Sequence, residues 1–272
     1  MATKLIAEIG WNHMGDMRIA EEMVKEAAES GAFFAKFQTW KVDRLKSGSW
    51  DHDGRRQIYE KAELTKEKHE FLIESCKRHN IKFLSSAFSI PDAILLKELN
   101  CRSIKIPSFE VTNSELIKFC MENFDEIIIS TGTATQKEVE HLRNQIDIDK
   151  TIVMHCVSCY PCVAQNANLP RINFLKKLFK NVGFSDHTQG INVSCSSIFY
   201  DLKYIEKHFT TDKDLPGRDN KFAILPGEMN TLNLFIKEHE EANNFHGNDF
   251  RPEEVDSREN YRNRFNNLKK LS

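Results

Sequence analysis

Short apolar runs alternate with helical patterns along most of the chain. The runs are rich in Ile, Val and Phe and are bounded by polar or turn-forming residues, which is typical of parallel strands buried on both faces. We predict eight such strands, at residues 4–9, 33–37, 81–85, 103–106, 126–130, 151–156, 182–184 and 204–206.

Amphipathic helices are predicted in the intervals between these strands. Apolar residues recur there at helical spacing, so each helix presents one face for burial. Side chains that commonly cap helices precede several of these patterns: Asp16, Thr65, Ser89 with Asp92, Asn113, and Thr135 with Glu138. The last pattern predicts a buried stripe made of Met229, Leu232, Phe235 and Ile236.

Eight consecutive β-then-α units predict an α/β fold, a (β/α)8 TIM barrel. The alternative is a doubly wound open sheet, but no G-x-G-x-x-G motif, its commonest support, follows the first strand. We expect a barrel domain over residues 1–245 and a charged, helical tail over 246–272. Two long connections, 40–63 and 210–226, are expected on the barrel face where chemistry occurs.

Composition narrows the classes of partner. The 38 basic and 40 acidic residues give a net charge of −2, which favours neither nucleic acid nor a membrane surface. The chain has no leader-like apolar segment and no run of about 18 apolar residues, so we expect a cytoplasmic protein. Cys156, Cys159 and Cys162 form a C-x-x-C-x-x-C run that begins inside a strand, where side chains diverge. All seven cysteines are therefore expected to be free thiols.

Polar side chains follow nearly every predicted strand, at the end that faces the mouth of a barrel. Buried lysines cost several kcal/mol each unless they are paired, so Lys36 and Lys105 indicate a small anionic ligand. The hydroxyls that could donate to the same anion are those of Ser86, Ser108, Thr131, Ser158 and Ser185.

Two histidines end the last two predicted strands. Neutral imidazoles on neighbouring strands can share one divalent ion, so His187 and His208 form a candidate open metal site. From their spacing alone, two unrelated histidines at strand ends are the more common explanation. Asp186 and Glu206 are more readily explained as partners of neighbouring groups than as metal ligands.

Seven motifs, in matching order and spacing, resemble those of the sialic acid synthase family over residues 4 to about 225. They are AEIGWNHMG at 7–15, KFQ at 36–38, KIPS at 105–108, STG at 130–132, HCVSCYP at 155–161, GFSDHT at 183–188 and EKHFT at 206–210. The resemblance implies a transferase that condenses phosphoenolpyruvate with an open-chain sugar aldehyde and water. The product would be a 2-keto-3-deoxy sugar acid, released together with phosphate.

The same resemblance implies a role for each matching residue. His187 and His208 would hold Mn²⁺ or Mg²⁺, and Glu8 would contact the aldehyde and the reacting water. Gln38, Glu110 and Asp219 would face the sugar or support the groups that do. The phosphoenolpyruvate cradle would consist of Lys36, Lys105, Ser86, Ser108, Ser130 or Thr131, Ser158 and Ser185.

The chain departs from the family pattern in three places. Ser86 stands in a strand-three motif, SSAFS, where relatives commonly carry Thr, and Arg218 and Asn220 replace parts of a Pro-Asp-His run. We also expect the chain to be without the antifreeze-like C-terminal domain that reaches into a partner's site in the family. The sugar pocket would then be completed by a homodimer, by another protein, by the 40–63 segment or by the tail, or it would not be completed at all.

Three functions stay open at this point. The first is a synthase acting on N-acetylmannosamine or on a diamino-dideoxy hexose. The second is a metal-dependent pyruvate aldolase on the same barrel, in which no phosphate is released. The third is a non-catalytic paralogue that binds a complete synthase.

Overall fold

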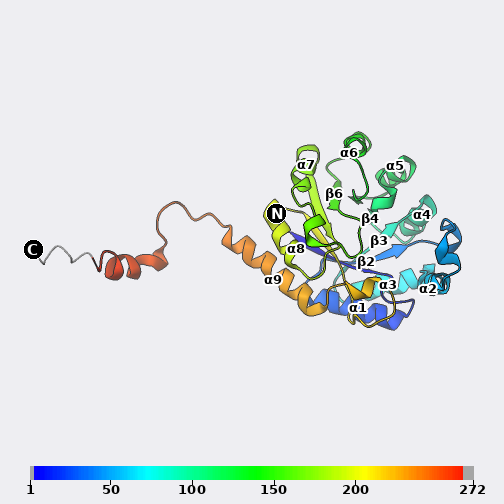
Figure 1. The fold of residues 1–272 in the computed structure, drawn as a ribbon, viewed down its shortest axis with the longest axis horizontal. Coiled ribbons are helices and arrows are strands. Elements are labelled where there is room, and N and C mark those ends of the chain that lie inside the picture. The colour runs from blue at the N-terminus through cyan, green and yellow to red at the C-terminus, as the bar shows by residue number, and fades with distance from the viewer. Residues whose placement is uncertain (1–2, 266–272) are drawn as a thin grey trace, which may run out of the picture. The chain divides into compact units, whose positions relative to one another are not determined.

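The computed structural model describes residues 3–265, and its centre is a closed barrel of eight parallel strands in sequence order (Figure 1). The fold predicted from the apolar runs is therefore confirmed. The strands are β1 (Lys4–Gly10), β2 (Phe34–Thr39), β3 (Lys82–Ala87), β4 (Ser103–Ile106), β5 (Glu126–Ser130), β6 (Thr151–Cys156), β7 (Asn181–Asp186) and β8 (Tyr204–His208).

Helices surround the barrel and cover the outward faces of its strands (Figure 1). They are α1 (Met17–Glu29), α3 (Lys66–Arg78), α4 (Ile90–Glu98), α5 (Ser114–Asn123), α6 (Gln136–Leu142), α7 (Arg171–Leu178), α8 (Asn192–Ser197) and α9 (Pro226–Ala242). A further helix, α2 (Arg55–Ala62), belongs to the long connection after β2. Short 3-10 turns in the connections include η1 (Val42–Arg44), η2 (Ser49–Asp51), η3 (Ser108–Glu110) and η6 (Asp219–Lys221).

Most of the predicted helix caps are present. The side chains of Asp16, Thr65 and Asn113 accept backbone N–H groups, and Thr135 forms a capping box with Glu138. Two details of the prediction are wrong. The Ser89 hydroxyl makes no cap bond, because it donates to Asp92 instead. Phe235 is 36% exposed, whereas Met229, Leu232 and Ile236 of the same helix are buried.

The barrel interior consists of two layers that follow from the alternation of side chains along each strand. The lower layer is an apolar plug formed by Ile6, Phe34, Leu84, Ile128, Ile152, Met154 and Tyr204. Two residues further along the same strands, the inward positions carry Glu8, Lys36, Ser86, Ser130, Cys156 and Glu206. The plug therefore fills the end of the barrel where the strands begin, and the polar layer lies at the mouth, where the strands end.

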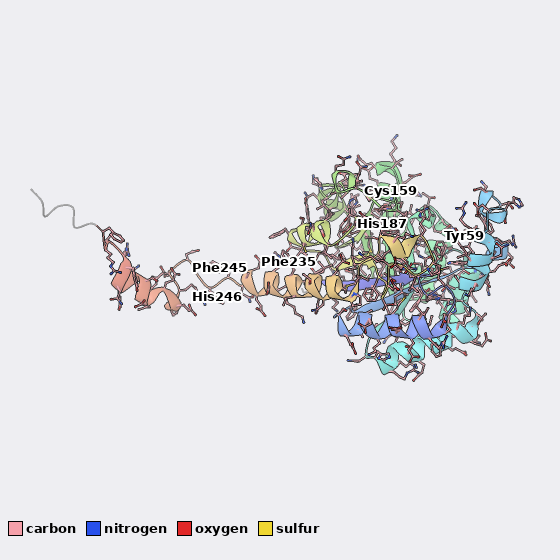
Figure 2. The ribbon with its side chains drawn as sticks, turned by 60° about the horizontal axis from the view of Figure 1, so that its bottom comes forward. Tyr59, Cys159, His187, Phe235, Phe245 and His246 are labelled. Carbon is pink, nitrogen blue, oxygen red and sulfur yellow. The ribbon has the colours of Figure 1, made fainter. Side chains whose placement is uncertain are left out.

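The described residues fall into two compact units, one ending at Lys237 and the other beginning at Glu238. In the second unit, Phe245 and His246 follow the end of α9, and Phe245 is 80% exposed (Figure 2). Its short helical turns are η7 (Pro252–Glu254) and η8 (Ser257–Tyr261), and residues 266–272 of the expected tail lie outside the described part. The predicted domain boundary after residue 245 stays a prediction.

None of the helices within residues 3–265 combines the length and apolarity needed to cross a bilayer.

Candidate active site

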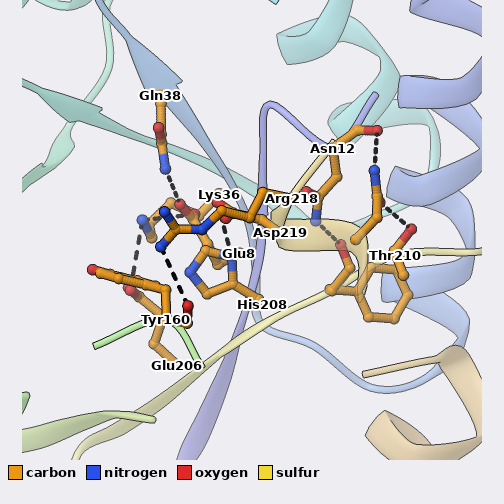
Figure 3. A network of polar contacts seen from close by, with 12 residues as sticks. Glu8, Asn12, Lys36, Gln38, Tyr160, Glu206, His208, Thr210, Arg218 and Asp219 are labelled. Carbon is orange, nitrogen blue, oxygen red and sulfur yellow. Dashed lines mark hydrogen bonds and ion pairs between the residues drawn. The ribbon is translucent and has the colours of Figure 1, made fainter. Parts of the chain in front are cut away.

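Four alternating charges form the floor of a cavity of about 650 Å³ at the mouth of the barrel. Lys36 Nζ lies 2.6 Å from Glu8 Oε2 and 3.6 Å from Glu206 Oε1, while Lys105 Nζ lies 2.8 Å from Glu206 Oε2. Gln38 Nε2 donates to Glu8 Oε1 at 2.7 Å (Figure 3). All four charged side chains are buried, so each depends on the others for compensation.

The four floor residues have shifted pKa values, each in a direction set by its neighbours. Burial would raise the pKa of Glu206, but Lys105 and Lys36 hold it at about 2, so this carboxylate stays charged. Burial also raises the pKa of Glu8, and here the attraction of Lys36 does not overcome it. The pKa of Lys36 is raised because Glu206 and Glu8 outweigh its burial, whereas burial lowers the pKa of Lys105. Glu8 is thus the floor carboxylate best placed to exchange a proton.

Hydroxyl groups surround this floor. Ser86 Oγ accepts from Lys36 Nζ at 3.1 Å, and Ser185 Oγ donates to Glu206 Oε1 at 3.0 Å. Ser108 Oγ accepts from the Gly132 N–H at 3.0 Å, which holds this hydroxyl in place at the cavity. Ser130 Oγ is buried and has no hydrogen-bond partner among residues 3–265. These four hydroxyls line the cavity together with the two lysines, as a cradle for a small anion requires.

Three residues expected at the site do not line the cavity. Thr131 faces the helices, where its hydroxyl donates to Met154 O at 2.9 Å and accepts from Arg171 at 3.0 Å. Ser158 lies beside Gly132, where a Cβ on that glycine would come within 2.2 Å of its hydroxyl oxygen. Glu110 accepts a hydrogen bond from Asn113 Nδ2 at 2.7 Å and so belongs to the start of α5.

His187 and His208 face each other across the ends of β7 and β8, with ring centroids 5.4 Å apart. His187 Nδ1 bonds the Val157 carbonyl at 2.8 Å, which makes Nδ1 the protonated nitrogen and leaves the lone pair on Nε2. His208 Nδ1 is buried, lies 3.8 Å from Asp219 Oδ2 and has no hydrogen-bond partner in the described part of the chain. Burial, then repulsion from His187 and Lys36, lowers the pKa of His208 well below its usual value.

These two imidazoles fit an open metal site, because one ring nitrogen is orphaned and the other ring is oriented by a backbone carbonyl. Within residues 3–265, no group of three or more His, Cys, Asp or Glu side chains is arranged to hold an ion. The C-x-x-C-x-x-C run is not a cluster, since Cys159 is exposed while Cys156 and Cys162 are buried. Any ion would therefore keep positions for substrate or water.

Sequence reasoning did not identify several residues of the cavity. Tyr160 packs against His187 with ring centroids 4.2 Å apart, and the Arg218 guanidinium lies over the Tyr160 ring. Trp11, Arg55 and Tyr59 also line the cavity. Glu206 was expected to be a partner of a lysine, and in the structure it pairs with two.

Comparison with known proteins identifies the family. Residues 23–248 match the model of the NeuB family. The chain belongs to the NeuB family. It is 36% identical to N,N'-diacetyllegionaminic acid synthase of Campylobacter jejuni, over 88% of this chain and 77% of the relative. It is 30% identical to a pseudaminic acid synthase of the same species, over 88% of this chain and 74% of that protein.

A solved structure supports the same assignment. The N-acetylneuraminic acid synthetase of Leptospira borgpetersenii superposes with a TM-score of 0.84 at 29% identity, covering 98% of this chain and 93% of that one. The resemblance seen in the motifs and the expectation of a transferase enzyme of the sialic acid synthase type are both confirmed.

Two departures from the NeuB pattern have a structural explanation. Ser86 keeps the hydroxyl of the strand-three motif and places it on Lys36. Asn220 is buried and ties the loop after β8 to the barrel, because it donates to Asn12 O at 3.2 Å and accepts from Thr210 Oγ1 at 2.6 Å. The loop is thereby held with Asp219 directed toward His208.

Proposed function

We propose that the chain condenses phosphoenolpyruvate with an open-chain N-acylated hexosamine and water. The products are a 2-keto-3-deoxy nonulosonic acid and phosphate. The observation that carries this proposal is that one cavity contains two facing histidines, the two buried lysines of the floor and four hydroxyl groups. Membership of the NeuB family, with its nonulosonic acid synthases, supports it.

The floor would bind phosphoenolpyruvate by an exchange of partners. The two ammonium groups already lie among carboxylate oxygens, so an entering phosphate or carboxylate takes over contacts that Glu8 and Glu206 now make. The hydroxyl of Ser130, which has no partner within the described residues, can donate to it. These fixed donors would stabilise the negative charge that develops as the phosphate leaves, a role often worth several kcal/mol.

The acceptor aldehyde would bind beside the two histidines. A divalent ion held by His187 and His208, Mn²⁺ or Mg²⁺, would supply Lewis-acid polarisation of a carbonyl oxygen when bound. Asp219 and Gln38 flank this region and can orient sugar hydroxyls. Holding both substrates in one cavity supplies the advantage of proximity.

The reaction forms one C–C bond and breaks the C–O bond to phosphate. The methylene carbon of phosphoenolpyruvate bonds to the aldehyde carbon, and the aldehyde oxygen takes up a proton to become a hydroxyl. Water adds at the former enol carbon and gives one proton to Glu8, the carboxylate whose pKa burial raises, which returns a proton to the aldehyde oxygen. The tetrahedral species then breaks its C–O bond to phosphate, its hydroxyl proton leaves with the phosphate, and a ketone remains. The Ser and Lys ring favours this route over a pyruvate aldolase, which has no phosphate to bind.

A phosphate-release assay tests the proposal. The chain is mixed with phosphoenolpyruvate, Mn²⁺ and a panel of N-acylated hexosamines, and both phosphate and the keto acid are measured. We expect equal amounts of both with at least one aldehyde, and none with His187→Ala. Formation of the keto acid from pyruvate without phosphate would favour the aldolase. Absence of phosphate with every aldehyde, together with unchanged metal affinity in His187→Ala, would overturn the synthase assignment.

A further inference from the structure

The second compact unit contains a short segment, residues 249–265, that leaves large apolar side chains in solvent. Phe250, Val255, Tyr261 and Phe265 are 47%, 41%, 56% and 88% exposed. Exposed apolar residues need no explanation when they are scattered singly, but a group of them marks a surface that a partner covers. Here they follow one another along a single short stretch of chain. The segment therefore presents apolar surface that its own residues leave uncovered.

The backbone of this segment is helical over one short stretch. The turns η7 and η8 are joined by Val255 and Asp256, both of which have right-handed helical φ and ψ (Figure 1). A helix shorter than about 12 residues is only marginally stable by itself in water, and most helices depend on the burial of an apolar face. The short helix and the exposed apolar side chains thus both indicate a partner surface.

Charge is divided between the two halves of the segment. Before Ser257 stand four acidic residues and one basic residue, which are Asp249, Glu253, Glu254, Asp256 and Arg251. After Ser257 stand three basic residues and one acidic residue, which are Arg258, Arg262, Arg264 and Glu259. The halves therefore carry opposite net charges, −3 (one basic against four acidic) and +2 (three basic against one acidic).

The contacts of the arginines keep these charges within their own halves. Arg251 Nε lies 3.6 Å from Glu253 Oε2, inside the acidic half. In the basic half, the guanidinium of Arg264 lies over the ring of Tyr261, 5.4 Å from its centroid. The guanidinium of Arg258 lies over the ring of Phe250 at 4.2 Å, so it contacts an apolar side chain of the acidic half and not a carboxylate.

The helix dipole gives one reason for this order of charges, because carboxylates stabilise the start of a helix and cations its end. It does not account for Asp249 and Arg264, which lie outside the helical stretch, or for the exposed apolar side chains. Two copies of the segment in antiparallel alignment account for all of these features. The acidic half of each copy then faces the basic half of the other, and the apolar side chains cover one another. A parallel alignment would oppose like charges.

We propose that residues 249–265 are a self-association surface, to which the same segment of a second copy of the chain binds in antiparallel orientation. This arrangement is twofold symmetric, so each copy presents the same surface and every contact between the acidic and basic halves occurs twice. The inference concerns the assembly of the chain and does not depend on the proposed function.

Two complementary variants of the full chain test this inference. In the first, Glu253→Lys and Glu254→Lys make both halves basic. In the second, Arg262→Glu and Arg264→Glu make both halves acidic. We expect sedimentation equilibrium to give the parent twice the mass of either variant, and an equimolar mixture of the variants to regain the mass of the parent. Each variant repels a copy of itself but is complementary to the other.

Matched controls place the effect in the segment. Glu238→Lys with Glu241→Lys makes the same change of charge at two exposed positions of α9 and should keep the mass of the parent. Phe265→Ser should weaken self-association at least about tenfold, whereas Leu234→Ser, which removes a 52% exposed side chain from α9, should not. Circular dichroism checks that every variant is folded.

Three outcomes would overturn the inference. The first is a parent whose mass equals that of both charge variants, because the segment would then contribute nothing to assembly. The second is a mixture that keeps the mass of its separate components, which would exclude the antiparallel contact. The third is dissociation of the Glu238 and Glu241 control, which would attribute the effect to overall charge and not to this segment.

Discussion

Lys207 and Asp186 form a buried ion pair between the ends of β8 and β7, with Lys207 Nζ 3.2 Å from Asp186 Oδ2. Each of them directly precedes one of the two histidines, so the pair lies on the opposite face of the strands. Lys207 Nζ also donates to Thr188 O at 2.5 Å. The pair ties the two strand ends together behind His187 and His208 and so fixes the separation of the rings.

Loss of one partner should therefore affect both stability and the histidines. We expect Lys207→Met to lower the free energy of unfolding by about 3–5 kcal/mol, because it leaves the charge of Asp186 buried without a neighbouring cation. Urea unfolding measures this change. Lys203→Met is the control, since Lys203 pairs with Glu126 at 3.6 Å at the other end of β8, where both are partly exposed, and its loss should cost about 1 kcal/mol or less. Similar losses in the two variants would show that the buried pair has no special role.

Substitutions of Ser130 and Thr131 should have different effects, the first on the binding of phosphoenolpyruvate and the second on the stability of the fold. Ser130 Oγ has no partner, so Ser130→Ala should leave the free energy of unfolding within about 0.5 kcal/mol while raising the KM for phosphoenolpyruvate about tenfold. Thr131→Val should do the reverse and cost about 1 kcal/mol, because Met154 O and Arg171 each lose a hydrogen bond to the hydroxyl. Steady-state kinetics and urea unfolding on both variants check this. A reversed pattern would assign the phosphate contact to Thr131.

The stability of the fold should fall as the pH drops from about 6.5 to 4, and His155 is one cause. Burial, the largest influence, lowers the pKa of His155 to about 4, and the charge of Arg171 adds to this. Below pH 6.5 the unfolded chain therefore binds a proton that the folded chain rejects. The free energy of unfolding should then decrease by up to about 1.4 kcal/mol per pH unit from this group, and be fully recovered above about pH 6.5.

Unfolding curves at pH 4.5, 5.5, 6.5 and 7.5 measure the effect. His155→Asn should show a smaller loss on acidification than the parent, although His13, whose pKa burial also lowers to about 4, keeps part of the slope. His141→Asn serves as the control because this histidine is exposed. A slope in His155→Asn as steep as the parent's would contradict the assignment.

Metal binding should depend on each of the two facing histidines. Titration of Mn²⁺, followed by electron paramagnetic resonance, should show affinity reduced about tenfold or more in His187→Ala and in His208→Ala, because two ligands leave no substitute. Mn²⁺ should also raise the unfolding temperature of the parent but not of either variant. Binding that survives in both variants would place the ion elsewhere.

The floor of the site could be predicted from the sequence, because side chains alternate along a strand and this determines which of them point into the barrel. Once β1 and β2 are placed with Ile6 and Phe34 in the plug, Glu8 and Lys36 must point inward two residues later. The paired histidines at the ends of the last two strands follow from the order of the strands in the same way. The buried floor thus needs only the strand positions, which long apolar runs indicate well.

The connections could not be predicted in this way. Glu110 lies in η3, and this turn brings its carboxylate to Asn113 and away from the cavity. The 40–63 segment contains α2, whose polar composition hides the Tyr59 contacts with three tryptophans. Phe235 has the spacing of the buried residues of α9, but it is partly exposed. Spacing along a helix does not show how far the neighbouring elements cover it. Each of these positions depends on contacts between segments that lie far apart in the chain.

The alternating charges of the floor have a further consequence for the ions that surround the protein. Lys36 and Lys105 are each paired with a carboxylate, because their Nζ atoms lie 2.6 Å from Glu8 Oε2 and 2.8 Å from Glu206 Oε2. An intruding anion must outcompete two tethered carboxylates, and chloride, a single atom, contacts too few of the lysines and hydroxyls at once to do so. The mouth should therefore remain open to a substrate that engages the lysines and the hydroxyls at once, even in a medium crowded with simple salts.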